Sequence, residues 1–131
     1  MKLHHSPTSP YVRKVMLTLH ETGQLDRVTL VPASGTPIAP DAGVIGVNPI
    51  GKIPALERPD GPALFDSRVI CRFLDSLHDG RKLYPEGAAL WTTLTLEALA
   101  DGIVDAAILC VYESRLRPEA LRFPPWVEGQ T

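Results

Sequence analysis

The run NPIGKIPAL, residues 48–56, constrains the fold of this chain more than any other stretch. It combines a turn, formed by Asn-Pro and then Gly, with a short apolar strand that begins after Ile53 and Pro54. Proline removes a backbone donor, and one reason to place it before a strand is a cis bond that turns the chain sharply. Such a bond would leave the Ile53 N–H and C=O free to pair with a short extended peptide. A rigid loop ahead of a strand is an equally well supported interpretation of this run alone.

The first part of the chain has the pattern of a β-α-β unit. Residues 2–5 and 28–31 are predicted strands, and residues 10–22 are a predicted helix with one apolar stripe and a proline in its first turn. A unit of this length implies parallel strands and a right-handed crossover. Residues 32–52 are rich in proline and glycine, so we expect mostly loop there, with one helical turn near residues 41–45.

The next elements complete a small α/β domain. Residues 55–58 and 63–65 flank a Pro-Asp-Gly-Pro turn, which predicts a β-hairpin. Asp66 or Ser67 then caps a predicted helix that continues to about Leu77. The order βαβ–ββα predicts a mixed four-stranded sheet with helices packed on it, which is the plan of a thioredoxin-like domain.

The organisation of the sequence changes after this helix. Residues 80–87 have the composition of a linker, and residues 88–117 contain no proline and continue as a helix of about 45 Å. The second half of this helix is apolar on nearly every side, so several other helices are needed to bury it. We therefore expect one domain at 1–79 and the beginning of an all-α domain at 88–131. The missing packing implies that Thr131 is not the natural end of the protein, or that a partner chain covers the helix.

Composition and charge exclude several functional classes. The net charge is −2 and the basic residues are scattered, so the chain lacks the basic patch of a nucleic-acid-binding protein. The longest apolar stretch, residues 106–112, is too short to cross a membrane. Cys71 and Cys110 match neither a disulfide framework nor a metal-ligand pattern. With no apolar signal segment at the N-terminus, these features predict a reducing, cytoplasmic setting.

The four histidines predict no metal site. His4 and His5 alternate across the faces of the first predicted strand, so they cannot both bind one metal ion from there. His20 and His78 lie on different predicted helices, and the sequence has no H-x-x-x-H or C-x-x-C motif. A glycine-rich phosphate loop is also absent from the sequence.

Five short motifs, taken together, resemble a known family: residues 6–14, 48–56, 65–67, 83–85 and 98–103. The chain is similar to the N-terminal thioredoxin-like domain and the start of the helical domain of a cytosolic glutathione transferase, close to the bacterial branch. The resemblance implies a homodimeric detoxification enzyme that joins glutathione to small, apolar electrophiles. The second half of the family's helical domain supplies much of the acceptor pocket, so the acceptor pocket of the chain as given is expected to be incomplete, and an inactive chain stays open as an alternative.

Ser9 is the candidate for activating the glutathione thiol. A thiol is nucleophilic only as its thiolate, and a hydroxyl donated to the sulfur at a helix N-terminus lowers the thiol pKa. Ser9 opens the first predicted helix, and in the resemblance it aligns with the serine or cysteine that several classes use at this place. Two alternatives stay open: Ser9 only caps the helix, or Ser6 or Thr8 supplies the hydroxyl.

The resemblance also implies how the rest of glutathione is held. Ile53 pairs with the cysteinyl backbone of glutathione from its place ahead of Pro54. Ser67 hydrogen-bonds the γ-glutamyl carboxylate at a helix N-terminus, and Asp66 suits the γ-glutamyl ammonium group. Lys52 either faces the glycyl carboxylate or is a solvated loop lysine.

One further candidate lies outside this group. In the resemblance, an acidic residue at the position of Asp101, on the long helix, reaches the γ-glutamyl amine that is bound by the partner subunit. A carboxylate on the face of the helix, with no role in binding, is an equally good interpretation of Asp101. The helix that begins at Ser67 and the long helix are both expected to face the partner subunit.

Two other functions stay open beside the transferase. A non-catalytic glutathione-binding or regulatory module would keep the fold and lose the reaction. A glutathione-dependent thiol-disulfide oxidoreductase needs a sulfur to form the mixed disulfide, and residues 6–10 contain no cysteine. The leading prediction is therefore a transferase that uses glutathione as co-substrate, needs no metal and relies on Ser9.

Overall fold

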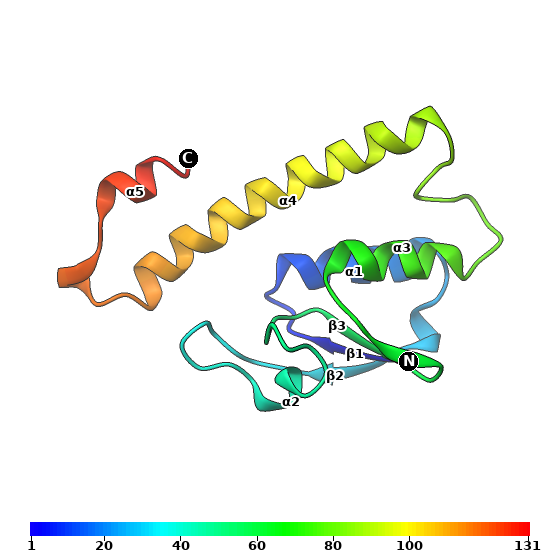
Figure 1. The fold of residues 1–131 in the computed structure, drawn as a ribbon, viewed down its shortest axis with the longest axis horizontal. Helices are drawn as coiled ribbons and strands as arrows, with labels where there is room; N and C mark the ends of the chain where they lie inside the picture. Colours follow the sequence, from blue (N-terminus) through cyan, green and yellow to red (C-terminus); the bar gives the residue numbers. More distant parts are fainter. The chain divides into compact units, whose positions relative to one another are not determined.

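A four-stranded sheet forms the centre of the first of two units, Met1–Pro85 and Glu86–Thr131, into which the chain divides (Figure 1). The strands are β1 (Lys2–His5), β2 (Thr29–Pro32), β3 (Ala55–Arg58) and β4 (Gly61–Leu64). The computed structural model describes all of residues 1–131. β1 pairs in parallel with β2 and antiparallel with β3, which pairs antiparallel with β4. The resulting order, β2-β1-β3-β4, confirms the predicted α/β plan.

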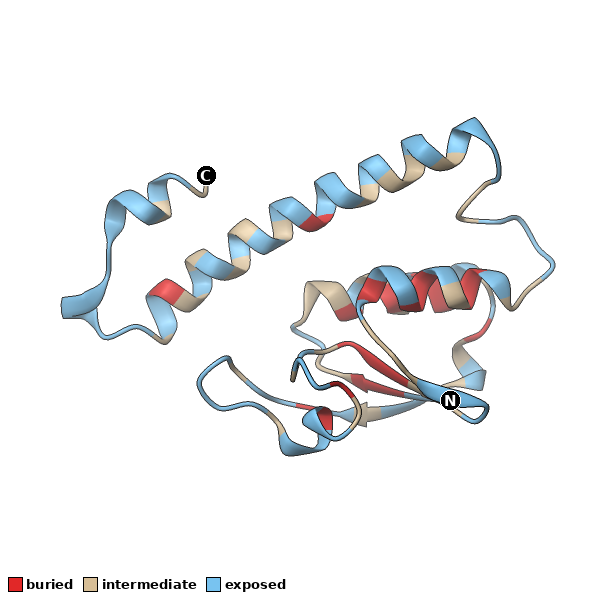
Figure 2. Cartoon of the chain, in the orientation of Figure 1, coloured by how far each residue is buried: buried red, intermediate tan, exposed pale blue.

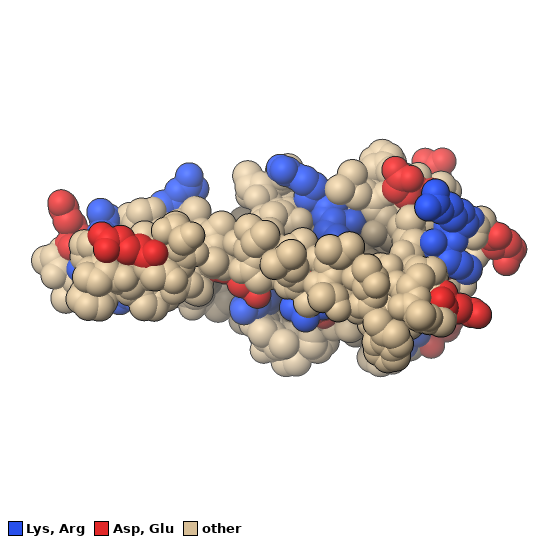
Figure 3. Space-filling view, turned by 90° about the horizontal axis from the view of Figure 1, so that it is seen from above, with Lys and Arg blue, Asp and Glu red and all other residues tan.

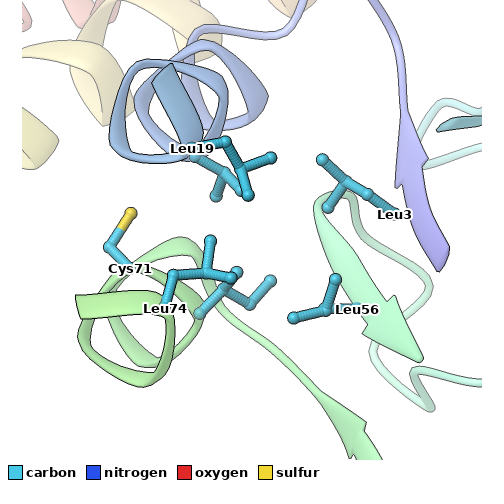
Figure 4. Close-up of a cluster of buried hydrophobic side chains, with 7 residues drawn as sticks. Leu3, Leu19, Leu56, Cys71 and Leu74 are labelled. Atoms are coloured by element: carbon cyan, nitrogen blue, oxygen red, sulfur yellow. The ribbon is translucent and has the colours of Figure 1, made fainter. Parts of the chain in front are cut away.

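Two helices, α1 (Pro10–Glu21) and α3 (Ser67–Ser76), lie side by side and cover one face of this sheet. Alternate residues of a strand point to the same face, so the sheet contributes apolar side chains that meet those of both helices (Figure 4). Figure 2 shows the buried residues concentrated in the same elements. Burying one such leucine contributes about 1.5–3 kcal/mol. The buried cluster consists of Leu3, Val15, Leu19, Leu56, Ile70, Cys71 and Leu74.

The connection between β2 and β3 lies on the other side of the sheet and contains the short helix α2 (Ala42–Ile45). His4 follows a core residue of β1 and therefore points to this second face, where it is buried. Its Nε2 lies 2.8 Å from Oε1 of Glu57 on the neighbouring strand. This hydrogen bond lowers the pKa of the Glu57 carboxyl, against the opposing effect of burial. The second face thus has a polar pair where the first face has a leucine core.

The second unit is built on one long helix, α4 (Ala88–Arg115), followed by η2 (Glu119–Leu121) and the short α5 (Pro124–Glu128). Glu113 joins these parts, because it accepts hydrogen bonds from the Arg117 Nε at 2.6 Å and from the Phe123 amide at 3.0 Å. Many large apolar side chains of α4 are exposed. No helix of the chain is both long enough and apolar enough to cross a membrane. Figure 3 shows acidic and basic side chains interspersed on one face of the molecule.

The structure corrects several predicted boundaries. β4 begins at Gly61 and not at residue 63, because Arg58 pairs with Gly61 and the turn between the strands is only two residues long. Pro62 is tolerated within β4, since this is an edge strand where a missing N–H breaks no ladder. β2 begins one residue later than predicted, and α4 ends at Arg115, two residues earlier. A 3-10 turn, η1 (Leu25–Arg27), was not predicted.

Candidate functional site

The strand directions bring four chain segments to one edge of the sheet. β1, β2 and β4 run the same way, so their carboxyl ends share this edge, and the antiparallel β3 begins there. α1 and α3 start at the same edge, because they follow β1 and β4 directly along the chain. The predicted residues on these segments therefore lie in one region of the first unit. They are Ser9, Lys52, Ile53, Pro54, Asp66 and Ser67.

Ser9 is the N-cap of α1 and lies where the helix dipole is positive. Its Oγ accepts a hydrogen bond from the Val12 amide at 3.3 Å, and its own amide donates to the Ser6 carbonyl at 3.1 Å. A hydroxyl has one proton to donate as well as lone pairs to accept. The capping bond uses a lone pair, so the Ser9 proton stays available to an anion. Capping and activation of a bound thiol are thus compatible in one side chain.

The rival hydroxyls of the same loop are arranged differently. The Oγ of Ser6 and the Oγ1 of Thr8 lie 2.9 Å apart and hydrogen-bond to each other. One of these two protons is therefore already used within the chain. Thr8 is exposed, whereas Ser9 is half-buried at the helix start. The geometry favours Ser9 over Ser6 and Thr8 as the donor to a bound group.

The main chain of Ile53 is left without partners. Neither its N–H nor its C=O makes a hydrogen bond within the chain. The Ile53–Pro54 peptide bond is cis, as is the Phe65–Asp66 bond. Buried Asn48 holds the loop before Ile53, because its Nδ2 donates to the Lys52 carbonyl at 2.7 Å and its Oδ1 accepts from the Ile50 amide at 3.0 Å. This loop presents a donor and an acceptor to a partner strand.

The N-terminus of α3 carries one paired and one unpaired side chain. The Asp66 carboxylate caps the helix and accepts from the Arg68 amide at 2.9 Å, and it remains largely exposed. Ser67 is 2% exposed, yet its hydroxyl has no hydrogen-bond partner in the chain. An unpaired hydroxyl beside free helix amides suits a carboxylate ligand. Lys52 has an exposed side chain and contributes only its carbonyl to the loop.

Asp101 lies on α4 in the second unit, apart in the sequence from the other predicted site residues. Its side chain is buried. The role of Asp101 at the glutathione site of a partner subunit stays a prediction. No group of three histidine, cysteine, aspartate or glutamate residues is arranged to hold a metal ion.

Sequence reasoning missed Asp41, which organises the loop between β2 and α2. Its Oδ2 accepts from the Ser34 amide at 3.0 Å, and its Oδ1 accepts from the Gly43 and Val44 amides at 2.9 Å and 3.2 Å. The hydrogen bond from the Ser34 amide, followed by that from Val44, holds the pKa of Asp41 below its ordinary value. The available signal was an aspartate directly before a short helical pattern, which is a preferred N-cap.

A hollow of about 310 Å³ lies at the carboxyl ends of β1 and β2. Parallel strands place their carboxyl ends together, and ligands of α/β proteins commonly bind in the crevice outside them. A larger hollow of about 490 Å³ lies at the other end of α1 and α3. Because Ser9 opens α1 at the opposite end, the smaller hollow is the one next to the candidate chemistry. Its lining comprises residues 5–7, residues 32–34 and Asp41.

Comparison with known proteins identifies the family. The model of the glutathione S-transferase N-terminal domain matches residues 8–77. The chain belongs to the glutathione S-transferase family. It is 36% identical over 121 residues to the GST-like protein YibF of Escherichia coli, a match that covers 92% of this chain and 57% of YibF. The family assignment confirms the resemblance seen in the sequence motifs.

Solved structures of glutathione transferase family members agree with this assignment. A family member from Pseudomonas fluorescens Pf-5, with bound glutathione, is 53% identical, with a TM-score of 0.96 over 98% of this chain. A glutathione S-transferase from Methylobacillus flagellatus, also with glutathione bound, is 39% identical with a TM-score of 0.81 over 98% of this chain. The chain spans 63% and 62% of the lengths of these two proteins.

Proposed function

We propose that the chain acts as the glutathione-binding part of a transferase, which joins the glutathione thiolate to a small electrophile. The observation that carries this proposal is the Ser9 hydroxyl, free to donate at the N-terminus of α1, on the same sheet edge as the unpaired Ile53 backbone. Family members that are 53% and 39% identical to this chain bind glutathione. Because these relatives bind glutathione, we propose that glutathione is the ligand of the unpaired groups in this chain.

Binding follows from the unpaired groups. The cysteinyl residue of glutathione pairs with the N–H and C=O of Ile53 as a short strand would. The γ-glutamyl carboxylate accepts hydrogen bonds from the Ser67 hydroxyl and from the free amides at the start of α3. The Asp66 carboxylate faces the γ-glutamyl ammonium group. Lys52, in the loop before Ile53, is proposed to face the glycyl carboxylate. Each of these contacts satisfies a group that the fold leaves unpaired or exposed.

Activation and reaction follow from the position of Ser9. Its hydroxyl donates a hydrogen bond to the sulfur, which favours the thiolate, and the positive end of α1 adds to this effect. The thiol proton leaves to solvent. The thiolate then forms a carbon–sulfur bond with the electrophile, and any leaving group departs with its electron pair. Serine suits this reaction, whereas disulfide exchange needs a cysteine that residues 6–10 do not contain.

Assembly and location belong to the same proposal. The transferase is proposed to be a cytoplasmic homodimer in which Asp101 of one subunit approaches the γ-glutamyl amine bound by the other. Two free cysteines, of which Cys71 is buried in the core, suit a reducing compartment. The chain spans less than two thirds of the length of these relatives. Catalytic turnover with an acceptor substrate is therefore proposed here and does not follow from the fold.

Ser9→Ala tests the proposal. We expect kcat/KM for an aryl halide and glutathione to fall about 100-fold, because one donor to the developing charge is lost. Thr8→Ala is the matched control, since it removes an exposed hydroxyl of the same loop, and it should have a much smaller effect. Unchanged kinetics in Ser9→Ala would show that Ser9 only caps the helix. Tight glutathione binding without turnover would favour the non-catalytic binding module.

A further inference from the structure

The bend after α3, residues 78–80, contains a histidine whose two ring nitrogens both have partners in the chain. His78 Nε2 lies 3.0 Å from Oδ1 of Asp75, and the Gly80 amide donates to His78 Nδ1 at 3.1 Å. We propose that His78 is a proton-sensitive switch, in which a proton taken up at Nδ1 opens the 78–80 bend while the residues after it stay bound to Asp75. The inference is independent of the proposed function, because neither Ser9 nor glutathione takes part in it.

The bond from Gly80 determines where the proton of the imidazole lies. A backbone N–H can only donate, so Nδ1 is the acceptor and carries no proton in the closed bend. The one proton of the neutral ring is therefore on Nε2, which donates it to the Asp75 carboxylate. The His78 side chain is only 13% exposed, so water has limited access to both bonds. The closed bend thus requires a neutral His78 in one defined tautomer.

Protonation changes the two bonds of the ring in opposite ways. An imidazolium carries an N–H on both nitrogens, so Nδ1 would face the Gly80 amide as donor against donor. The bond from Nε2 to Asp75 becomes an ion pair, which keeps the ring in place. Acidic and basic side chains are equal in number around residues 77–80, so the two direct bonds decide the outcome. The charged residues there are Asp75 in α3, Glu21 in α1, Arg27 in η1, and Asp79, Arg81 and Lys82 in the following segment.

The residues after the bend are held by bonds that do not involve the ring. Asp75 accepts from the Leu83 amide at 2.8 Å and from the Tyr84 amide at 3.1 Å, and Lys82 Nζ donates to the Asp75 carbonyl at 2.8 Å. Burial raises the pKa of the Asp75 carboxyl, but the Leu83 amide, His78 and the Tyr84 amide outweigh it and hold this pKa below 3.8. Asp75 therefore stays ionised at the pH values where histidines gain a proton.

Two NMR measurements on the full chain test the proposal. The ring nitrogen shifts of His78 report its tautomer at about pH 8, where we expect the form protonated on Nε2. The exchange of the Gly80 amide with water is followed from about pH 8 to about pH 5 and divided by its intrinsic rate. We expect its protection to fall about tenfold, the effect of one lost hydrogen bond. The Leu83 and Tyr84 amides are internal controls and should keep their protection.

Variants at position 78 separate the acceptor from the proton. His78→Asn offers a side-chain oxygen to the amide two residues on, a bond that asparagine commonly makes in turns, and it does not titrate. The Gly80 amide should therefore stay protected at both pH values in this variant. His78→Ala should lose the protection at both. His20→Asn, which changes an exposed histidine of α1, is the matched control and should respond to pH like the unaltered chain.

The possible results decide the matter clearly. A proton on Nδ1 at high pH, Gly80 protection that does not change with pH, or an equal loss at Leu83 and Tyr84 would overturn the role of His78. A pH response that persists in His78→Asn would also overturn it. Should a His78 variant not fold, the tautomer and the amide exchange of the unaltered chain still give the answer. A chain that fails to bind glutathione would refute the proposed function and leave this inference standing.

Discussion

The two ends of the α1–α3 helix pair differ in how their polar groups are satisfied. At the end where both helices begin, the Ser67 hydroxyl and the Ile53 N–H and C=O have no partners in the chain. At the end where both helices finish, the buried Asp75 carboxylate accepts from the Leu83 amide at 2.8 Å and the Tyr84 amide at 3.1 Å. Polar groups that the chain leaves unpaired are open to a ligand, and the buried Asp75 carboxylate is satisfied within the chain, so we assign the first end to ligand binding and the second to stability.

We call the end where both helices finish the closing end. Its polar groups form hydrogen bonds with residues from several elements. His78 Nε2 lies 3.0 Å from Oδ1 of Asp75, and Lys82 Nζ donates to the carbonyls of Asp75 and His78. Gln24, after α1, donates to the Leu74 carbonyl at 2.8 Å. These bonds tie the segment after α3 back to the helix pair. The larger of the two hollows lies here, and its side chains His78 and Lys82 already have partners in the chain.

Asp75→Ala gives the largest expected effect and tests the closing end. We expect the free energy of unfolding to fall by about 3 kcal/mol, because the Leu83 and Tyr84 amides lose their buried acceptor. Glutathione affinity of the folded variant should change less than twofold, since the substitution is at the far end of α3. Urea denaturation and calorimetry measure the two quantities. A large loss of affinity with intact stability would reverse the assignment of the two ends.

Ser67→Ala tests the end where both helices begin, which we call the opening end, and should give an intermediate effect. We expect the dissociation constant for glutathione to rise about tenfold, because a hydrogen bond to a carboxylate is lost. The free energy of unfolding should change by less than about 0.5 kcal/mol, since the Ser67 hydroxyl has no partner to lose. Ser76→Ala, at the other end of α3, is the matched control and should leave glutathione affinity unaltered. Equal affinities in Ser67→Ala and the unaltered chain would remove Ser67 from the site.

The pH dependence of stability gives a smaller effect that sharpens the comparison. Burial raises the pKa of Asp75, but the amides of Leu83 and Tyr84 and the His78 side chain outweigh it and hold the pKa below the ordinary 3.8. A depressed folded-state pKa means that the stabilisation is present above 3.8 and is lost as the pH falls through the folded-state value. The stability difference between the unaltered chain and Asp75→Asn should therefore shrink below pH 3.8. A difference that stays constant with pH would contradict this role of Asp75.

The opening end could be predicted from the sequence because its signals are local. Ser9 precedes a helical pattern with proline in its first turn, and the run from Asn48 to Pro54 encodes a turn and a strand entry within seven residues. A helix cap depends on atoms three residues away, so its chemistry is visible in a short window. The same holds for Asp66, whose cap bond reaches Arg68.

The closing end and the hollow could not be predicted in this way, because their contacts span longer distances in the sequence. Asp75 binds amides eight and nine residues away, across a segment with the composition of a linker. Asp41 reaches back seven residues to Ser34, and His5 meets the β2 end only through strand pairing. Nor does a pattern reveal that Ser67 is a buried residue whose hydroxyl has no partner in the chain. Whether a polar side chain finds a hydrogen-bond partner depends on the packed structure and not on a local motif.

The pKa of the glutathione thiol on the protein tests the central claim most directly. It is obtained from the ultraviolet absorbance of the thiolate as the pH is varied, with glutathione bound to the full chain and to Ser9→Ala. In the unaltered chain, we predict that the pKa of the bound thiol lies at least about two units below that of a free thiol. In Ser9→Ala, we predict that this pKa rises most of the way back to the free-thiol value. A bound thiol with an ordinary pKa, or a lowered pKa that Ser9→Ala leaves in place, would contradict the role of the Ser9 hydroxyl.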